Sequence, residues 1–115
     1  MTNNEFEQRK ICEQWGAPYL RTDIDQKIGI SDNLMKGIYP INGLRHPPLG
    51  DTSGWYIWAG DEMGYEDDFF KPVHAEHLED CFCGLEKYLG LAPGWRFLIA
   101  PEYEDVWFDP SLLNV

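Results

Sequence analysis

The sequence predicts an α+β fold, with a mainly antiparallel sheet packed by two main helices in a single domain of residues 1–115. Three observations lead to this fold class. Helical periodicity is confined to two segments, several short apolar runs are bounded by Gly or Pro, and turn-forming residues join the last runs closely. A chain of 115 residues, 43% of them hydrophobic, is sufficient for one domain with its own core.

The first predicted helix covers residues 4–15. Asn4 is suited to cap it, with Glu7 three positions further on, and Gly16 and Pro18 end it. One face of this helix is apolar, made of Ile11, Cys12 and Trp15.

The second predicted helix runs from Val73 to Leu89 and ends at Gly90. Its apolar stripe is opposed by a face rich in acids. The stripe consists of Leu78, Cys81, Phe82, Leu85 and Leu89.

Strands are predicted where β-branched or aromatic residues form short runs. A single helical turn is expected over 32–36. The extended segment 38–42 contains Pro40, which cannot donate a main-chain hydrogen bond, so this segment is expected to be an edge strand. A short link, residues 101–104, predicts that the last two strands form an antiparallel hairpin. The predicted extended segments are 27–31, 38–42, 55–59, 95–100 and 105–109.

A structured loop is predicted over residues 42–54, which are dense in turn formers. Arg45 lies in this loop, and we expect it to tie the loop to a carboxylate such as Asp51 or Asp61.

The charge is unevenly distributed. Residues 1–50 contain six acids and six bases, whereas residues 51–115 contain fourteen acids and three bases, so the net charge of −11 arises entirely in the second part. Such a field repels nucleic acid and anionic membranes and speeds encounter with basic proteins. A solubilising role is the plainer interpretation of the same acidity.

The acids of the second part are interleaved with aromatic residues, a combination typical of protein interfaces. Phe70 and Trp107 are expected in the core, while Tyr65 and Tyr103 are open to either role. The predicted partner-binding residues are Asp61, Glu62, Tyr65, Glu66, Asp67, Asp68, Glu102, Tyr103, Glu104 and Asp105. A solvated acidic face, calcium binding and acid–base catalysis are the alternatives for these carboxylates.

No catalytic or cofactor-binding motif is present in the sequence, so we expect neither a metal nor a cofactor, and no enzymatic activity. His74 and Cys81 would lie about 10 Å apart along a helix, too far to share one zinc ion. Cys83 would face away from Cys81. Cys12 is expected on the buried face of its helix, where a thiol is a poor nucleophile.

A cytoplasmic location is expected. The N-terminus lacks a signal-peptide pattern, and no apolar run approaches the ~20 residues of a membrane span. Three cysteines without a framework spacing, Cys12, Cys81 and Cys83, fit a reducing compartment.

Several short motifs occur in a recognisable order along residues 27–113. The most specific is Ser53-Gly54-Trp55 followed by Gly60-Asp61-Glu62. The others are Ile30-Ser31 through Gly37, Asp51-Thr52, His77-Leu78, Gly94-Trp95-Arg96-Phe97 and Asp105-Val106-Trp107. Together these motifs resemble the bacterial immunity protein 33 family. The helix of residues 4–15 lies outside the expected family region.

The resemblance implies an immunity protein of a polymorphic toxin system, which binds and neutralises a cognate toxin. It transfers no catalytic residues. Combined with the charge distribution, it predicts occlusion of a basic toxin through the acidic surface. The alternative is a small-molecule- or metal-binding enzyme that uses the clustered carboxylates. Oligomeric state is left open.

Overall fold

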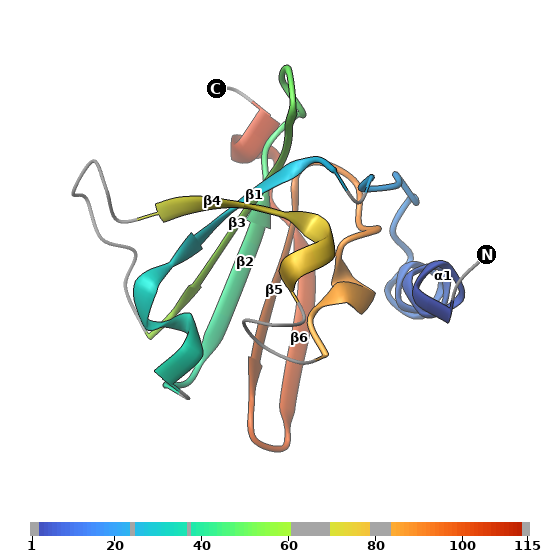
Figure 1. Cartoon of the computed structure of the whole chain (residues 1–115). Coiled ribbons are helices and arrows are strands. Elements are labelled where there is room, and N and C mark those ends of the chain that lie inside the picture. Colours follow the sequence, from blue (N-terminus) through green and yellow to red (C-terminus); the bar gives the residue numbers. More distant parts are fainter. Residues whose placement is uncertain (1–2, 24, 37, 61–69, 79–83, 114–115) are drawn as a thin grey trace.

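In the residues that the structure describes, the fold consists of a six-stranded mixed sheet, one α-helix and several 3₁₀ turns (Figure 1). The computed structural model describes residues 3–23, 25–36, 38–60, 70–78 and 84–113. The helix α1 spans Asn3–Trp15. The strands are β1 Lys27–Ser31, β2 Ile41–Arg45, β3 Thr52–Ala59, β4 Phe70–His74, β5 Trp95–Ala100 and β6 Tyr103–Phe108. The 3₁₀ turns are η1 Asp32–Lys36, η2 Ala75–His77, η3 Glu86–Tyr88 and η4 Pro110–Leu113.

The sheet has the strand order β4-β1-β3-β2-β5-β6. Strands β1 and β3 are parallel, because β2 is inserted on the far side of β3, and all other neighbouring pairs are antiparallel. The predicted α+β class and the predominance of antiparallel pairing are therefore confirmed. The predicted β5–β6 hairpin is confirmed as well, and its two-residue turn is Pro101–Glu102.

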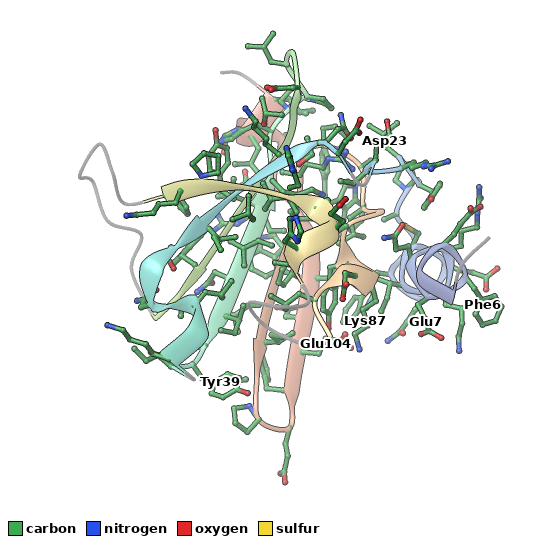
Figure 2. All side chains as sticks on the ribbon, viewed as in Figure 1. Phe6, Glu7, Asp23, Tyr39, Lys87 and Glu104 are labelled. Atoms are coloured by element: carbon green, nitrogen blue, oxygen red, sulfur yellow. The ribbon has the colours of Figure 1, made fainter. Side chains whose placement is uncertain are left out.

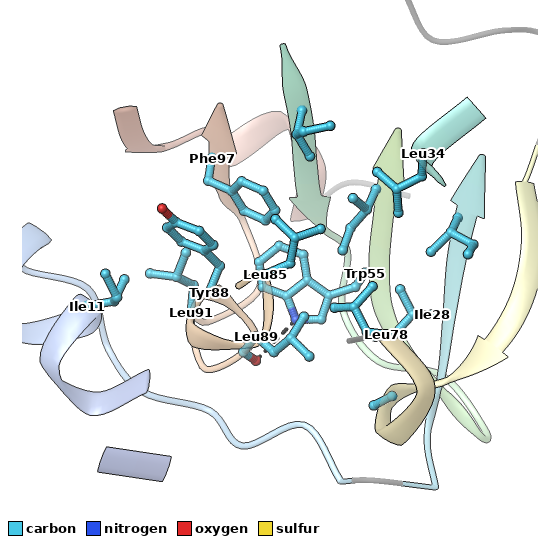
Figure 3. Close-up of a cluster of buried hydrophobic side chains, with 14 of the residues drawn as sticks. Ile11, Ile28, Leu34, Trp55, Leu78, Leu85, Tyr88, Leu89, Leu91 and Phe97 are labelled. Atoms are coloured by element: carbon cyan, nitrogen blue, oxygen red, sulfur yellow. Dashed lines mark hydrogen bonds between the residues drawn. The ribbon is translucent and has the colours of Figure 1, made fainter. Parts of the chain in front are cut away.

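One face of the sheet carries the main core. Trp55 and Ile57 of β3 and Phe97 of β5 are fully buried there (Figure 3). The chain around η3 covers them, and the Tyr88 ring stacks on Phe97 with centroids 4.4 Å apart. Close packing requires glycine at position 43, since a Cβ there would lie 2.2 Å from the Phe97 ring.

The prediction of a second main helix over residues 73–89 is wrong. Residues up to His74 belong to β4, because they pair with β1 along its length. Gly84 then adopts a φ of 96°, which a continuous right-handed helix cannot contain. The predicted stripe still describes burial, since Leu78, Leu85 and Leu89 are buried, while Cys81 and Phe82 lie outside the described residues.

The prediction of an edge strand at residues 38–42 is also wrong. Strand β2 lies between β3 and β5 in the sheet. Pro40 is tolerated because it precedes the first residue of the strand, so its missing N–H removes no bond within β2, and its carbonyl accepts from Gly60 at 2.8 Å.

The loop predicted over residues 42–54 is confined to 46–51, because 42–45 pair with β3 and Thr52 pairs with β1. The remaining element predictions agree with the structure. The N-terminal helix is present, with Ile11 and Cys12 buried. Strands occur at 27–31 and 95–100, and the turn at 32–36 is a 3₁₀ helix. The strand predicted at 55–59 begins earlier, at Thr52, and the one predicted at 105–109 begins at Tyr103.

Arg45 is fully buried, and its guanidinium binds main-chain carbonyls. Nε donates to Ser53 O at 2.9 Å, and Nη1 donates to Leu20 O and Leu91 O, each at 2.8 Å. Longer bonds of 3.4 Å reach Leu89 O and Arg21 O. One side chain thus joins the start of β3, the segment after α1 and the segment after η3.

The predicted pairing of Arg45 with a carboxylate is not what the structure shows. Asp51 instead pairs with Lys27 at 3.0 Å, and Asp61 lies outside the described residues. Burial lowers the pKa of Arg45 to about 10, which leaves the guanidinium charged at neutral pH. Carbonyl dipoles take the place of a counter-ion because they satisfy its donors directly.

Replacing Arg45 by Met should lower the free energy of unfolding by about 3 kcal/mol or more, because several buried carbonyls would lose their donor. Urea unfolding followed by tryptophan fluorescence measures this. Arg9→Met is the control, since that side chain is 59% exposed in its pair with Glu5 and should contribute less than about 1 kcal/mol. A loss below about 1 kcal/mol for Arg45→Met would contradict this role.

Candidate functional site

The predicted partner-binding residues that the structure describes lie together on the β5–β6 hairpin. We call Glu102, Tyr103, Glu104 and Asp105 the acidic hairpin. Glu102 occupies the turn with a φ of 62°, and it is exposed. Tyr103, at the start of β6, is 54% exposed. The remaining predicted residues lie outside the described residues, namely Asp61, Glu62, Tyr65, Glu66, Asp67 and Asp68.

The acidic hairpin presents acids on both faces of the sheet. Side chains alternate along β6, and Val106 is buried in the main core, so Glu104 lies on the core-side face. Asp105 lies on the opposite face, across from Leu98 of β5. Both acids are half-buried, whereas Glu102 is exposed at the tip. A partner therefore meets negative charge on whichever side it approaches the hairpin.

Glu104 is held in place by the core. The hydroxyl of Tyr88 donates to Glu104 Oε2. Tyr88 is only 2% exposed and is stacked on Phe97, so the position of this carboxylate is fixed by buried aromatic packing. Burial raises the pKa of the Tyr88 hydroxyl, and the bond to the Glu104 carboxylate raises this pKa further.

A shallow depression of about 510 Å³ adjoins the acidic hairpin on this side. Glu104 of β6 and Lys87 of η3, both labelled in Figure 2, border it. Ile99 and Ala100 provide an apolar part of its lining. Its open shape and mixed lining suit the side chains of a protein partner better than an enclosed small molecule.

Phe70 and Trp107, both predicted to be core residues, are half-buried on the second face of the sheet. Phe70 packs against Tyr56 and Trp58, with ring centroids 5.1 and 6.2 Å away. The Arg96 guanidinium lies 5.4 Å from the centre of the Trp107 ring. Phe70 thus belongs to a secondary cluster, and Trp107 is partly covered rather than fully enclosed.

The described residues contain no group of three His, Cys, Asp or Glu side chains arranged to hold a metal ion. The rings of His74 and His77 stack with centroids 6.2 Å apart, and Cys81 and Cys83 lie outside the described residues. Cys12 is buried and donates to Gly90 O at 3.4 Å, and burial raises its pKa, which disfavours the reactive thiolate.

A catalytic pocket built from Arg45 and the neighbouring carboxylates would have supported the enzymatic alternative. Arg45 is enclosed, and its donors bind main-chain oxygens, so it is unavailable to a substrate. Asp61 and Glu62 lie outside the described residues.

Two features of the site are not evident in the sequence alone. The support of Glu104 by Tyr88 joins residues 16 positions apart, and no local pattern marks it. The position of β6 at the edge of the sheet depends on the strand order. The run Tyr-Glu-Asp-Val-Trp-Phe over 103–108 does not alternate between apolar and polar residues, so the sequence provides no period-two signal for the two faces of this strand.

The structure is a small α+β fold, and its described candidate site is a surface formed by the acidic hairpin and the shallow depression beside it. The chain belongs to the Imm33-like family, because the family model of the Imm33-like domain matches residues 7–109. The resemblance to the immunity protein 33 family is thereby confirmed. The match begins inside α1, so the similarity extends further toward the N-terminus than the expected residues 27–113.

No curated protein and no solved structure matches this chain. None of the helices within the described ranges combines the length and apolar character that a membrane span requires.

The Tyr88–Glu104 bond predicts a loss of stability at alkaline pH. Because the pKa of Tyr88 is raised in the folded state, its contribution is complete below the unfolded value of about 10 and is lost as the pH rises above it. We expect the unfolding free energy to fall above pH 10, by up to about 1.4 kcal/mol per pH unit from this group.

Tyr88→Phe should remove that part of the pH dependence and cost about 1 kcal/mol at pH 7. Urea unfolding at pH 7, 9 and 11 measures both effects. Tyr103→Phe is the matched control, because its ring is largely exposed, and it should change neither value. Equal alkaline losses in the native protein and Tyr88→Phe would show that the bond makes no such contribution.

Proposed function

We propose that this protein is a bacterial immunity protein that binds a cognate protein toxin and neutralises it by occluding its active site or substrate groove. Membership of the Imm33-like family supports the class of function. The observation that supports the mode of binding is the exposed acidic hairpin on a chain of net charge −11. We further propose that it acts in the cytoplasm and without enzymatic activity.

The toxin surface that meets the hairpin is proposed to be basic. Acids outnumber bases fourteen to three in residues 51–115, which favours encounter with a positively charged protein and disfavours nucleic acid and anionic membranes. Tyr103 supplies an exposed aromatic ring among these charges. Aromatic residues commonly provide affinity at interfaces, while surrounding charges steer association and select the partner.

The second acidic segment is proposed to extend the same interface. It contains Asp61, Glu62, Tyr65, Glu66, Asp67 and Asp68. Its composition, acids around an aromatic ring, matches that of the acidic hairpin. Scanning this segment by charge reversal tests its contribution separately from that of the hairpin.

Neutralisation is tested by co-expression with the toxin domain encoded in the reading frame beside its own gene. Induction of that domain alone should stop growth of a bacterial host, and co-expression of this protein should restore it. The purified pair should also form a complex of equal stoichiometry. Growth arrest that persists despite expression of the folded protein would overturn the proposed function.

Charge reversal of the acidic hairpin should slow binding to this toxin domain. We expect the double variant Glu102→Lys and Asp105→Lys to reduce the association rate about tenfold or more at low ionic strength, because steering charges act mainly on encounter. The difference should shrink in 0.5 M salt, where the Debye length is about 4 Å. Surface plasmon resonance over a salt series measures both.

The double variant Glu7→Lys and Glu13→Lys is the matched control. It makes the same change in net charge at two exposed acids of α1. Its association rate should fall less than that of the hairpin variant. An equal fall would mean that only the total charge matters, and the hairpin would then lose its assignment as the contact surface.

A further inference from the structure

The two outer strands of the described sheet, β4 and β6, differ in whether their sequences contain residues that hinder pairing with a further strand. An edge strand leaves a row of main-chain N–H and C=O groups available for another strand, and proteins commonly block such rows with Pro or Lys. The sequence of β4 contains Lys71 and Pro72, whereas that of β6, Tyr-Glu-Asp-Val-Trp-Phe, contains neither.

The register shows that Pro72 is placed to block the β4 edge. Ala75 N donates to Gln26 O at 2.8 Å, and neighbouring residues of an antiparallel strand alternate in the direction of their main-chain groups. Two residues before Ala75, the main-chain groups of Val73 also point toward β1. Those of Pro72, the residue before it, therefore point away from β1. The missing N–H of Pro72 therefore removes a donor from the outer edge at no cost to the pairing with β1.

The same reasoning identifies the outward groups of β6. Asp109 N donates to Gly94 O at 2.7 Å, continuing the register in which Phe108 lies opposite Trp95. Trp107, Asp105 and Tyr103 therefore bond to β5. The residues whose main-chain N–H and C=O point away from β5 are Glu104, Val106 and Phe108.

The ends of β6 are exposed, and its centre is anchored. Tyr103 is 54% exposed and Phe108 is 46% exposed. Val106 between them is buried through its place in the main core, which fixes the strand in position. A strand held in this way is pre-organised for pairing, so little ordering is required when a partner binds.

Charge selects the occupant of this edge. Glu104 and Asp105 lie on opposite faces of β6, and Glu102 lies at its start. A second copy of this chain would bring another net charge of −11 and its own acids to the same edge, which repels it. A strand with Lys or Arg opposite these acids gains cross-strand pairs on either face.

We propose that the toxin adds a basic β-strand to the open edge of β6, hydrogen-bonded to the main chain of Glu104, Val106 and Phe108. This inference rests on the proposed function and specifies how the two proteins meet. Main-chain bonding provides affinity in this mode, and the acids on the two faces provide selectivity.

Amide hydrogen exchange on the complex with the neighbouring-frame toxin domain tests this mode. The N–H groups of Glu104, Val106 and Phe108 should exchange at least about tenfold more slowly in the complex than in the free protein, while His74 on the β4 edge should not change. A stable complex without slower exchange at β6 would overturn this inference and leave the proposed function standing. Absence of any complex would overturn both.

A pair of substitutions at Phe108 isolates one main-chain bond. Phe108→Ala removes the ring that lies 5.7 Å from Trp95 and keeps the N–H, whereas Phe108→Pro removes both. We expect Phe108→Pro to weaken toxin binding about tenfold more than Phe108→Ala. Equal weakening by the two folded variants would contradict an added strand at this position. If Phe108→Pro does not fold, as judged by circular dichroism, the exchange data decide.

Light scattering of the free protein tests whether a second copy of this chain pairs with the β6 edge. A monomeric mass at high concentration is expected. A dimer whose β6 amides are already protected in the absence of toxin would overturn the assignment of this edge to a basic partner.

Discussion

The buried guanidinium of Arg45 is the interaction on which the arrangement of the fold depends. The main-chain oxygens that it binds belong to three segments distant in sequence, at Leu20, Ser53 and Leu91. Each of these oxygens would otherwise lose its hydrogen bond to water on burial, and the charge itself would be unsupported. The segment after η3 is thereby fixed over the core face, and the adjacent Trp55 donates its indole N–H to Leu89 O at 3.2 Å in the same region.

The candidate binding surface is built outward from this region. Tyr88 of η3 stacks on Phe97 and donates to Glu104, so core packing fixes the position of one carboxylate of the hairpin. The neighbouring acids, Glu102 and Asp105, lie at the turn and on the other face. Affinity is proposed to come from the open main chain of β6 and selectivity from its acids. Within the described sheet, Pro72 removes a donor from the outer edge of β4, whereas β6 contains no proline, so β6 is the edge better suited to an added strand.

Sequence periodicity predicted the fold class, the N-terminal helix and the final hairpin, because these depend on contacts between near neighbours. It failed for residues 73–89, where pairing of β4 with β1 and the positive φ of Gly84 override a helical pattern. It also failed for Arg45, since carbonyls contributed by three separate segments cannot be read from composition. The acidic hairpin was predicted from local composition, but its place at a sheet edge required the strand order.

The bond between Tyr88 and Glu104 has a consequence for how such a protein can diverge. The side chains of Glu102 and Tyr103 are exposed, and that of Asp105 lies on the face away from the main core, so exchanging them leaves the packing of the core unchanged. Glu104 is different, because its loss leaves a buried phenol without its acceptor. A lineage that follows a changing toxin is therefore free to vary three positions of the hairpin, while the fourth changes only together with position 88.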